Sequence, residues 1–92
     1  MIRSFRVAET RLLFETGHSR RFAAVAKIAM RKLVQLDSAV ELRDLTSPPG
    51  NRLEVLAGDR KGQYSVRIND QFRICFRWTA QGPENVEIVD YH

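Results

Sequence analysis

Residues 63–78 read QYSVRINDQFRICFRW and contain two runs in which apolar and polar side chains alternate. A period of two is typical of a β-strand, because successive side chains point to opposite faces of a sheet. The intervening Asn69-Asp70 is a tight-turn signal, so the two runs predict an antiparallel hairpin. Its apolar side chains would share one face: Tyr64, Val66, Ile68, Phe72, Ile74, Phe76 and Trp78.

Further strands are expected on both sides of this hairpin. Leu53 and Val55 alternate with polar residues, and the turn at 58–62 (GDRKG) leads from them into the hairpin. After a Gly-Pro loop at 79–85, residues 86–91 predict a last strand. We expect Leu53 and Val55 to join the apolar face of the hairpin.

The first half of the chain predicts a short strand and two helices. Residues 2–7 alternate weakly, and residues 9–16 suit a helix that Gly17 ends. Ser19 is a candidate N-cap for a longer helix, which the break at 46–51 (TSPPGN) separates from the strands. The apolar residues of that helix are Phe22, Val25, Ala26, Ala29, Leu33, Leu36 and Val40, while Arg21, Lys27, Arg31, Lys32 and Gln35 are expected to face away.

These elements predict an α+β fold with two N-terminal helices on one face of a small, mostly antiparallel sheet. With 92 residues, of which 43% are hydrophobic, the chain is expected to form a single domain over residues 1–92. One cysteine, Cys75, allows no internal disulfide, and the N-terminus lacks an uninterrupted apolar stretch, so a reduced, cytoplasmic protein is expected. No apolar run is long enough for a transmembrane helix, and no membrane partner is expected.

The charge pattern favours a polyanionic partner. The net charge is +4, and the 15 basic residues include only three lysines, the rest being arginine, which pairs bidentately with phosphate. Strand alternation places a polar set on the sheet face opposite the helices: Arg52, Glu54, Gln63, Ser65, Arg67, Arg73 and Arg77. A polyanion site and an ordinary solvated face both remain open at this point.

The chain ends in Asp90-Tyr91-His92, three groups that can donate or accept protons. Alternation places Asp90 and His92 on one face and Tyr91 on the other, without indicating which face is buried. A frayed polar terminus is the alternative. Metal binding is not expected, because no Cys or His pair has ligand spacing. Cys75 is expected to be a small packing residue rather than a nucleophile.

Three segments carry a resemblance to a known family: IRSF at 2–5, SPPGNRLEVLAGDRKGQYSVRINDQFRICFRW at 47–78, and VEIVDYH at 86–92. Together they closely resemble the HigB toxins of the RelE/ParE superfamily. The resemblance implies a small α+β domain with helices on a curved sheet, and a toxin of a type II toxin–antitoxin pair. It also implies an endoribonuclease that cleaves mRNA in the A site of the 70S ribosome without metal or cofactor. The implied partner is a HigA-like helix-turn-helix antitoxin.

The resemblance further implies a catalytic group of Arg73, Asp90, Tyr91 and His92. In a metal-free reaction the 2′-hydroxyl attacks the scissile phosphate, so we expect Arg73 to stabilise the phosphorane. His92 suits proton transfer, because its unperturbed pKa lies near working pH. Asp90 is a candidate base or a residue that orients His92. Tyr91 is expected to hold a base or a phosphate.

Some HigB toxins have a catalytic histidine where this sequence has Glu54. Glu54 is therefore a candidate general base, and equally a candidate salt-bridge partner for Arg73 or Arg52. Phosphate contacts are expected from a further set of cations: Arg52, Arg60, Lys61, Arg67 and Arg77. Two rival functions stay open, a ParE-like gyrase poison and a non-enzymatic nucleic-acid-binding module.

Overall fold

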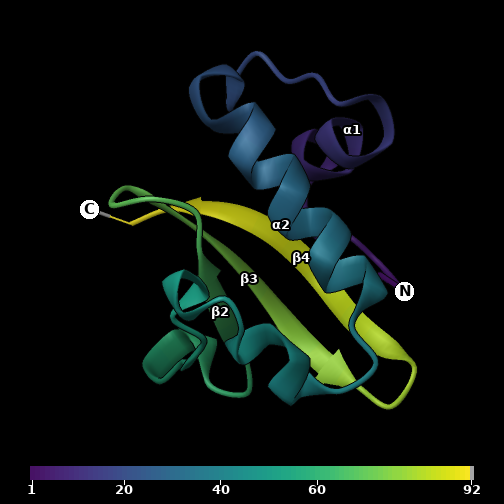
Figure 1. The fold of residues 1–92 in the computed structure, drawn as a ribbon, viewed down its shortest axis with the longest axis vertical. Coiled ribbons are helices and arrows are strands. Elements are labelled where there is room, and N and C mark those ends of the chain that lie inside the picture. The colour runs from purple at the N-terminus through teal and green to yellow at the C-terminus, as the bar shows by residue number, and fades with distance from the viewer. Residues whose placement is uncertain (92) are drawn as a thin grey trace.

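The computed structural model describes residues 1–91. In this part of the chain two α-helices precede four strands (Figure 1), which confirms the expected α+β fold. The helices are α1 (Ala8–Thr16) and α2 (Ala26–Ser38), and the strands are β1 (Glu54–Val55), β2 (Tyr64–Arg67), β3 (Phe72–Thr79) and β4 (Gly82–Asp90). Short 3₁₀ turns connect them: η1 (Ala23–Val25), η2 (Leu42–Thr46), η3 (Pro49–Asn51) and η4 (Gly58–Arg60). Neither helix is long and apolar enough to cross a membrane, and this holds for all of residues 1–91.

The strands form one antiparallel sheet in the order β1-β2-β3-β4. The predicted hairpin is confirmed, with Val66 opposite Ile74 and Ser65 opposite Cys75. β4 begins at Gly82 rather than Val86, so most of the expected loop at 79–85 is strand. Gly82 has a φ of 129°, a conformation that glycine tolerates best, which lets the chain reverse tightly after Thr79.

The N-terminal segment lies beside β4 and runs parallel to it. Phe5 forms a parallel bridge with Val86, the amide of Arg6 donates to the carbonyl of Val86, and the amide of Val86 donates to the carbonyl of Ser4. The expected strand at 2–7 is thus reduced to a single bridge. Its hydrogen bonds nevertheless cover the outer edge of β4, which would otherwise be exposed.

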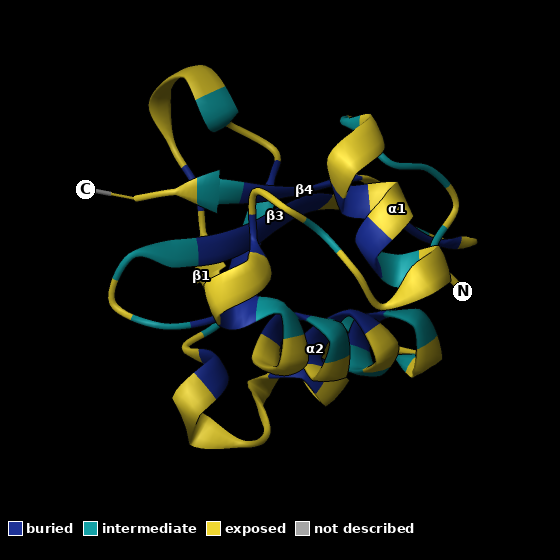
Figure 2. Cartoon of the chain, turned by 90° about the horizontal axis from the view of Figure 1, so that it is seen from above, coloured by how far each residue is buried: buried dark blue, intermediate teal, exposed yellow. Residues whose placement is uncertain are grey.

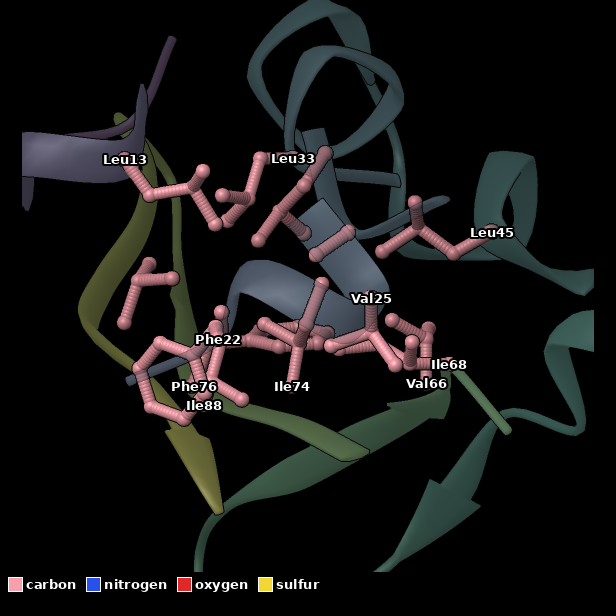
Figure 3. Close-up of a cluster of buried hydrophobic side chains, with 13 residues drawn as sticks. Leu13, Phe22, Val25, Leu33, Leu45, Val66, Ile68, Ile74, Phe76 and Ile88 are labelled. Atoms are coloured by element: carbon pink, nitrogen blue, oxygen red, sulfur yellow. The ribbon is translucent and has the colours of Figure 1, made fainter. Parts of the chain in front are cut away.

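The two helices cover one face of the sheet and form the core with it. Figure 3 shows Leu33 of α2 above Ile74 of the sheet, and Val25 of η1 above Val66 and Ile68. α1 ends as expected, because Gly17 adopts a left-handed conformation (φ 77°) and its amide donates to the carbonyl of Leu13. The buried apolar residues are Leu13, Phe22, Val25, Ala29, Leu33, Leu36, Leu45, Val66, Ile68, Ile74, Phe76, Val86 and Ile88.

The second helix is shorter than the sequence predicts. The Ser19 hydroxyl accepts a hydrogen bond from the amide of Phe22, so it caps the turn before α2 rather than α2 itself. Ala39 is extended, and Val40, which was expected in the core, is 85% exposed. That prediction was wrong because the helix ends before Val40 can reach the sheet.

Two further burial predictions were wrong, and Figure 2 shows how burial varies along the chain. Val55 is 75% exposed, because β1 has only two residues and lies at the edge of the sheet. Lys32, which was expected to face solvent, is buried and donates a hydrogen bond to the buried side chain of Asn51. The η3 turn therefore packs against the side of α2 that periodicity assigned to water.

Candidate active site on the open face of the sheet

Strand register places one row of polar side chains across the sheet face opposite the helices, which we call the open face. Glu54 pairs with Ser65, Ser65 with Cys75, and Cys75 with Glu87, so the row crosses all four strands. Arg6 continues it on the N-terminal segment, where it forms an ion pair with Glu87. The predicted grouping of Glu54, Ser65 and Arg73 on this face is confirmed by the register.

Arg73 is the most constrained cation of the open face. Its Nε donates to the Ser65 hydroxyl at 2.7 Å, and its Nη2 donates to the carbonyl of Arg52 at 2.7 Å. A longer bond of 3.4 Å joins Nη2 to the Ser65 carbonyl. The side chain is only 10% exposed, so its guanidinium is held in one orientation beside the surface.

Glu54 and Tyr91 flank the Arg73 guanidinium. Glu54 Oε1 forms an ion pair with Nη2 at 3.8 Å, as expected for a salt-bridge partner of Arg73, and its side chain is 55% exposed, so the carboxylate is also open to solvent. The Tyr91 ring centroid lies 6.0 Å from Arg73 Cζ, at the outer limit of a cation–π contact. Burial raises the pKa of the Tyr91 phenol, and the neighbouring Cys75 raises it further. The phenol therefore remains protonated at neutral pH and is able to donate a hydrogen bond.

Cys75 lies beneath Tyr91 and has no exposed surface. Burial raises the pKa of its thiol, although Arg60, Arg73 and a hydrogen bond with Tyr91 act in the opposite direction. A buried, protonated thiol is a poor nucleophile. The burial agrees with the expected packing role of this cysteine.

Glu87 joins two separate segments to β4. Its Oε2 accepts a hydrogen bond from Arg60 Nη1 at 3.2 Å and lies 3.4 Å from Arg6 Nε. Arg60 also donates to the Gln63 side chain, so the β1–β2 connection is tied down over the open face. Arg60 was predicted to contact phosphate, but much of its hydrogen-bonding capacity is directed at the protein.

The remaining predicted cations are at the surface. Arg52, Lys61 and Arg77 are exposed, while Arg67 forms an ion pair with Asp70 in the β2–β3 turn. Asp90 accepts a hydrogen bond from Gln71 and pairs with Phe72, whose side chain packs toward the helices. The Asp90 side chain therefore starts on the sheet face opposite that of Tyr91, as alternation predicts. His92 lies outside the described residues.

The open face is a surface rather than an enclosed pocket. A hollow of about 530 Å³ lies beside α1 and is lined by Glu9, Leu12, Ser19, Arg20 and Arg21, none of which is a predicted site residue. We rank the open face above this hollow, since a polyanion strand is bound along a charged surface. Within residues 1–91 no three Cys, His, Asp or Glu side chains gather in a way that could hold a metal ion.

Ser65, Glu87 and Arg6 are contact residues that sequence reasoning did not assign to the site. Alternation placed Ser65 on the correct face. Its hydrogen bond with Arg73, however, depends on the Arg73 side chain extending from β3 across to β2. Glu87 and Arg6 gave no usable signal, since they are 81 residues apart and meet only because the N-terminal segment lies beside β4.

The arrangement of helices and sheet defines a class of protein. Two helices on one four-stranded antiparallel sheet make this an α+β protein, and a chain of the YoeB–YefM complex from Staphylococcus aureus superimposes with a TM-score of 0.62. That match covers 100% of this chain and 98% of the other, at 16% sequence identity. At this identity the likeness concerns the fold alone.

Sequence comparison then identifies the family. The family described as RelE-like toxin of type II toxin-antitoxin system HigB matches residues 3–92, and the chain belongs to it. Toxin HigB-1 of Vibrio cholerae is 45% identical over 56 residues, which are 61% of this chain and 59% of that protein. Endoribonuclease HigB of Proteus vulgaris is 33% identical over 94 residues, covering 100% of both chains.

Proposed function

We propose that this toxin is an endoribonuclease that cleaves mRNA in the A site of the translating ribosome. The observation that carries the proposal is the buried, doubly anchored Arg73 beside Glu54 and Tyr91 on a cationic open face. The name of the Proteus vulgaris relative, Endoribonuclease HigB, supports the same activity. Because ribosomes are its site of action, the protein would work in the cytoplasm.

The proposed reaction uses the RNA's own 2′-hydroxyl as nucleophile. A base removes its proton, the 2′-oxygen bonds to phosphorus, and the bond from phosphorus to the 5′-oxygen breaks. The departing 5′-oxygen takes up a proton, which leaves a 2′,3′-cyclic phosphate and a 5′-hydroxyl. Charge on the phosphate grows during the attack, so a fixed guanidinium in a poorly solvated position stabilises the transition state.

We assign Arg73 to that stabilisation. Glu54 is the candidate base next to it, since its carboxylate is accessible and lies 3.8 Å from the guanidinium. Tyr91, protonated at neutral pH, would donate a hydrogen bond to a phosphate oxygen or hold a nucleobase of the RNA. Asp90 and His92 remain the proposed proton-transfer groups of the C-terminus, with Asp90 acting as base or orienting His92.

Exposed cations would hold the RNA or ribosomal RNA around this centre. Arg52, Lys61 and Arg77 have solvent-accessible side chains on or beside the open face, and Arg67 and Arg60 supplement them once their ion pairs open. Replacing one of these cations should weaken RNA binding and reduce its salt dependence, while the chemical step stays unchanged. We further propose a HigA-like helix-turn-helix antitoxin as the inhibitory partner.

Cleavage mapping tests the proposal directly. Purified protein is incubated with an mRNA, with and without 70S ribosomes, and the cuts are mapped by primer extension. Asp90→Ala with His92→Ala should abolish the cuts, Arg73→Ala should slow them about a hundredfold or more, and Arg20→Ala on the helix side should leave them unchanged. Cuts only on ribosome-bound mRNA that disappear in the Asp90 and His92 double variant are the expected result.

A ParE-like gyrase poison is the outcome to exclude. If no RNA is cut under either condition while the toxin still arrests growth, the ribonuclease proposal fails. A gyrase cleavage assay on supercoiled plasmid then decides whether DNA breaks replace RNA cuts. If arrest also survives the Asp90 and His92 changes, a non-enzymatic binding module becomes the better description.

A further inference from the structure

Arg73 contacts the protein through two of its three guanidinium nitrogens. Nε is bonded to the Ser65 hydroxyl, and Nη2 to the carbonyls of Arg52 and Ser65. Nη1 makes no hydrogen bond to any of residues 1–91. Because the guanidinium is planar, fixing Nε and Nη2 also fixes the direction in which the two Nη1 protons point.

Ser65 is the side chain that provides this anchor. It is fully buried and lies on β2 opposite Cys75, whereas Arg73 lies on β3 opposite Arg67. The bond therefore runs diagonally across the two strands and draws the Arg73 side chain back over the sheet. Without this bond more rotamers would be open to the arginine, and holding it in one of them would cost side-chain entropy.

The second anchor is a main-chain carbonyl placed by an unusual turn. Arg52 follows η3 with a φ of 44°, a left-handed conformation that few non-glycine residues adopt. Its carbonyl accepts the Nη2 hydrogen bond of Arg73 at 2.7 Å. Both anchors are therefore uncharged oxygen atoms, so they orient the guanidinium without neutralising it.

That neutrality separates Ser65 from an ordinary salt-bridge partner. A carboxylate at hydrogen-bond distance from Nε would oppose the positive charge that a phosphate needs. Glu54, the nearby carboxylate, stays 3.8 Å from Nη2 and is half-exposed to water, which screens its charge. Nη1 is therefore the guanidinium nitrogen left to meet a phosphate, since the Glu54 ion pair lies on the Nη2 side.

We infer that Ser65 is a positioning residue for RNA cleavage, whose hydroxyl holds Arg73 so that Nη1 meets the phosphate during attack. The inference rests on the proposed function and adds to it a residue that does not touch the substrate. Ser65 has no exposed surface, so its effect on the reaction must pass through Arg73.

A double-mutant cycle tests this route. Single-turnover cleavage rates on ribosome-bound mRNA are compared for wild type, Ser65→Ala, Arg73→Ala and the double variant, with Ser38→Ala as a control on the outer side of α2. We expect Ser65→Ala to lower the rate about tenfold at saturating toxin, and Arg73→Ala by about a hundredfold or more. In the Arg73→Ala background, Ser65→Ala should have no further effect.

A second readout does not depend on activity. Side-chain ¹⁵N NMR of the toxin should show a slowly exchanging Nε–H of Arg73 in wild type and in Ser38→Ala, and rapid exchange in Ser65→Ala. Ser65→Cys, which keeps nearly the same volume but offers a weak acceptor, should behave like Ser65→Ala. It provides the same comparison if the alanine variant does not fold.

The outcomes separate the two claims. Wild-type protein that cuts no ribosome-bound mRNA contradicts the proposed function, and the role of Ser65 with it. A wild type that cleaves while Ser65→Ala cleaves equally fast contradicts only the positioning role. The same holds if Ser65→Ala lowers the rate by the same factor with and without Arg73, because that pattern indicates a purely structural effect.

Discussion

The ammonium of Lys32 on α2 donates a hydrogen bond to the side-chain carbonyl of Asn51, and both residues are buried. The side-chain Nδ2 of Asn51 in turn donates to the carbonyls of Leu45 and Ser47, at 3.1 and 3.3 Å. These bonds attach the turn at 47–51 to the helix layer. Arg52 follows Asn51 in the chain, and its carbonyl accepts a hydrogen bond from Arg73. The Lys32–Asn51 hydrogen bond therefore connects the core of the protein to the candidate site.

Replacing Asn51 by alanine should destabilise the protein substantially. The change leaves the Lys32 ammonium and the Leu45 carbonyl without their buried partner, and the expected loss is about 2–4 kcal/mol. Urea denaturation of Asn51→Ala measures it, with Gln81→Ala in the exposed β3–β4 turn as control. A loss below about 0.5 kcal/mol would show that water replaces Asn51 without cost.

The buried ammonium of Lys32 should leave a signature in the pH dependence of stability. Burial lowers the pKa of Lys32, and the neighbouring Arg31 and Arg67 lower it further. The folded state therefore loses this proton before the unfolded state does, and stability rises with pH between the folded pKa and the ordinary value of 10.5. Below that window the charged form reduces stability.

A matched variant isolates this effect. Lys32→Met lacks the ammonium, so the stability of wild type relative to Lys32→Met should increase as the pH is raised from neutral toward the ordinary lysine pKa. Urea denaturation of both proteins at each pH provides the comparison, and the titration of Cys75 and Tyr91 cancels in the difference. A difference that stays flat or falls would contradict the lowered pKa.

Cys75 should resist alkylation in the native protein. Its thiol is fully buried, and burial raises its pKa, so both access and thiolate content are low at neutral pH. Iodoacetamide followed by mass spectrometry should give little modification in buffer and complete modification in urea. Rapid modification of the folded protein would mean that the β1–β2 connection opens readily above the thiol.

Gly82→Ala should be far more damaging than Gly50→Ala. A Cβ at Gly82 would overlap the carbonyl oxygen of Met1, and the φ of 129° is unfavourable for alanine. We expect a loss of about 2–4 kcal/mol, together with release of the N-terminal segment from β4. At Gly50 a Cβ meets nothing within 4 Å. Thermal denaturation compares the two, and equal melting temperatures would contradict the close approach.

Arg60 and Lys61 are neighbours that should respond differently to truncation. Arg60→Ala removes the bond to the largely buried Glu87 and should lower stability by about 1 kcal/mol, whereas Lys61→Ala should change it by less than about 0.5 kcal/mol. RNA affinity over a salt series should fall for Lys61→Ala with a smaller salt slope. If Arg60→Ala instead leaves stability unchanged, Arg60 serves RNA binding alone.

Sequence periodicity identified the layers of this fold because it reflects local geometry. In the run from Phe72 to Trp78, every second side chain points to the same face whatever the rest of the protein does. The hairpin, the α+β class and the placement of Ser65 and Arg73 on the open face followed from that property. Gly17 likewise marked the end of α1, since a left-handed residue is a local requirement.

Periodicity failed where burial depends on distant segments. The outward side of α2 reads as solvated, yet Lys32 is buried there because the η3 turn folds back onto it. Val55 and Val40 read as core, yet neither lies beneath a helix. The choice between buried and exposed required knowledge of what packs above each residue.

The sequence by itself determined which residues share a face and that arginine dominates the open one. Only the tertiary structure decided that Ser65 and the Arg52 carbonyl hold Arg73, with Glu54 and Tyr91 beside it. These contacts join β1, β2, β3 and the end of β4, so they depend on strand register and on the Arg52 turn together. Alternation assigns the residues of one strand to the two faces of the sheet, but it contains no information about which residues of neighbouring strands are paired.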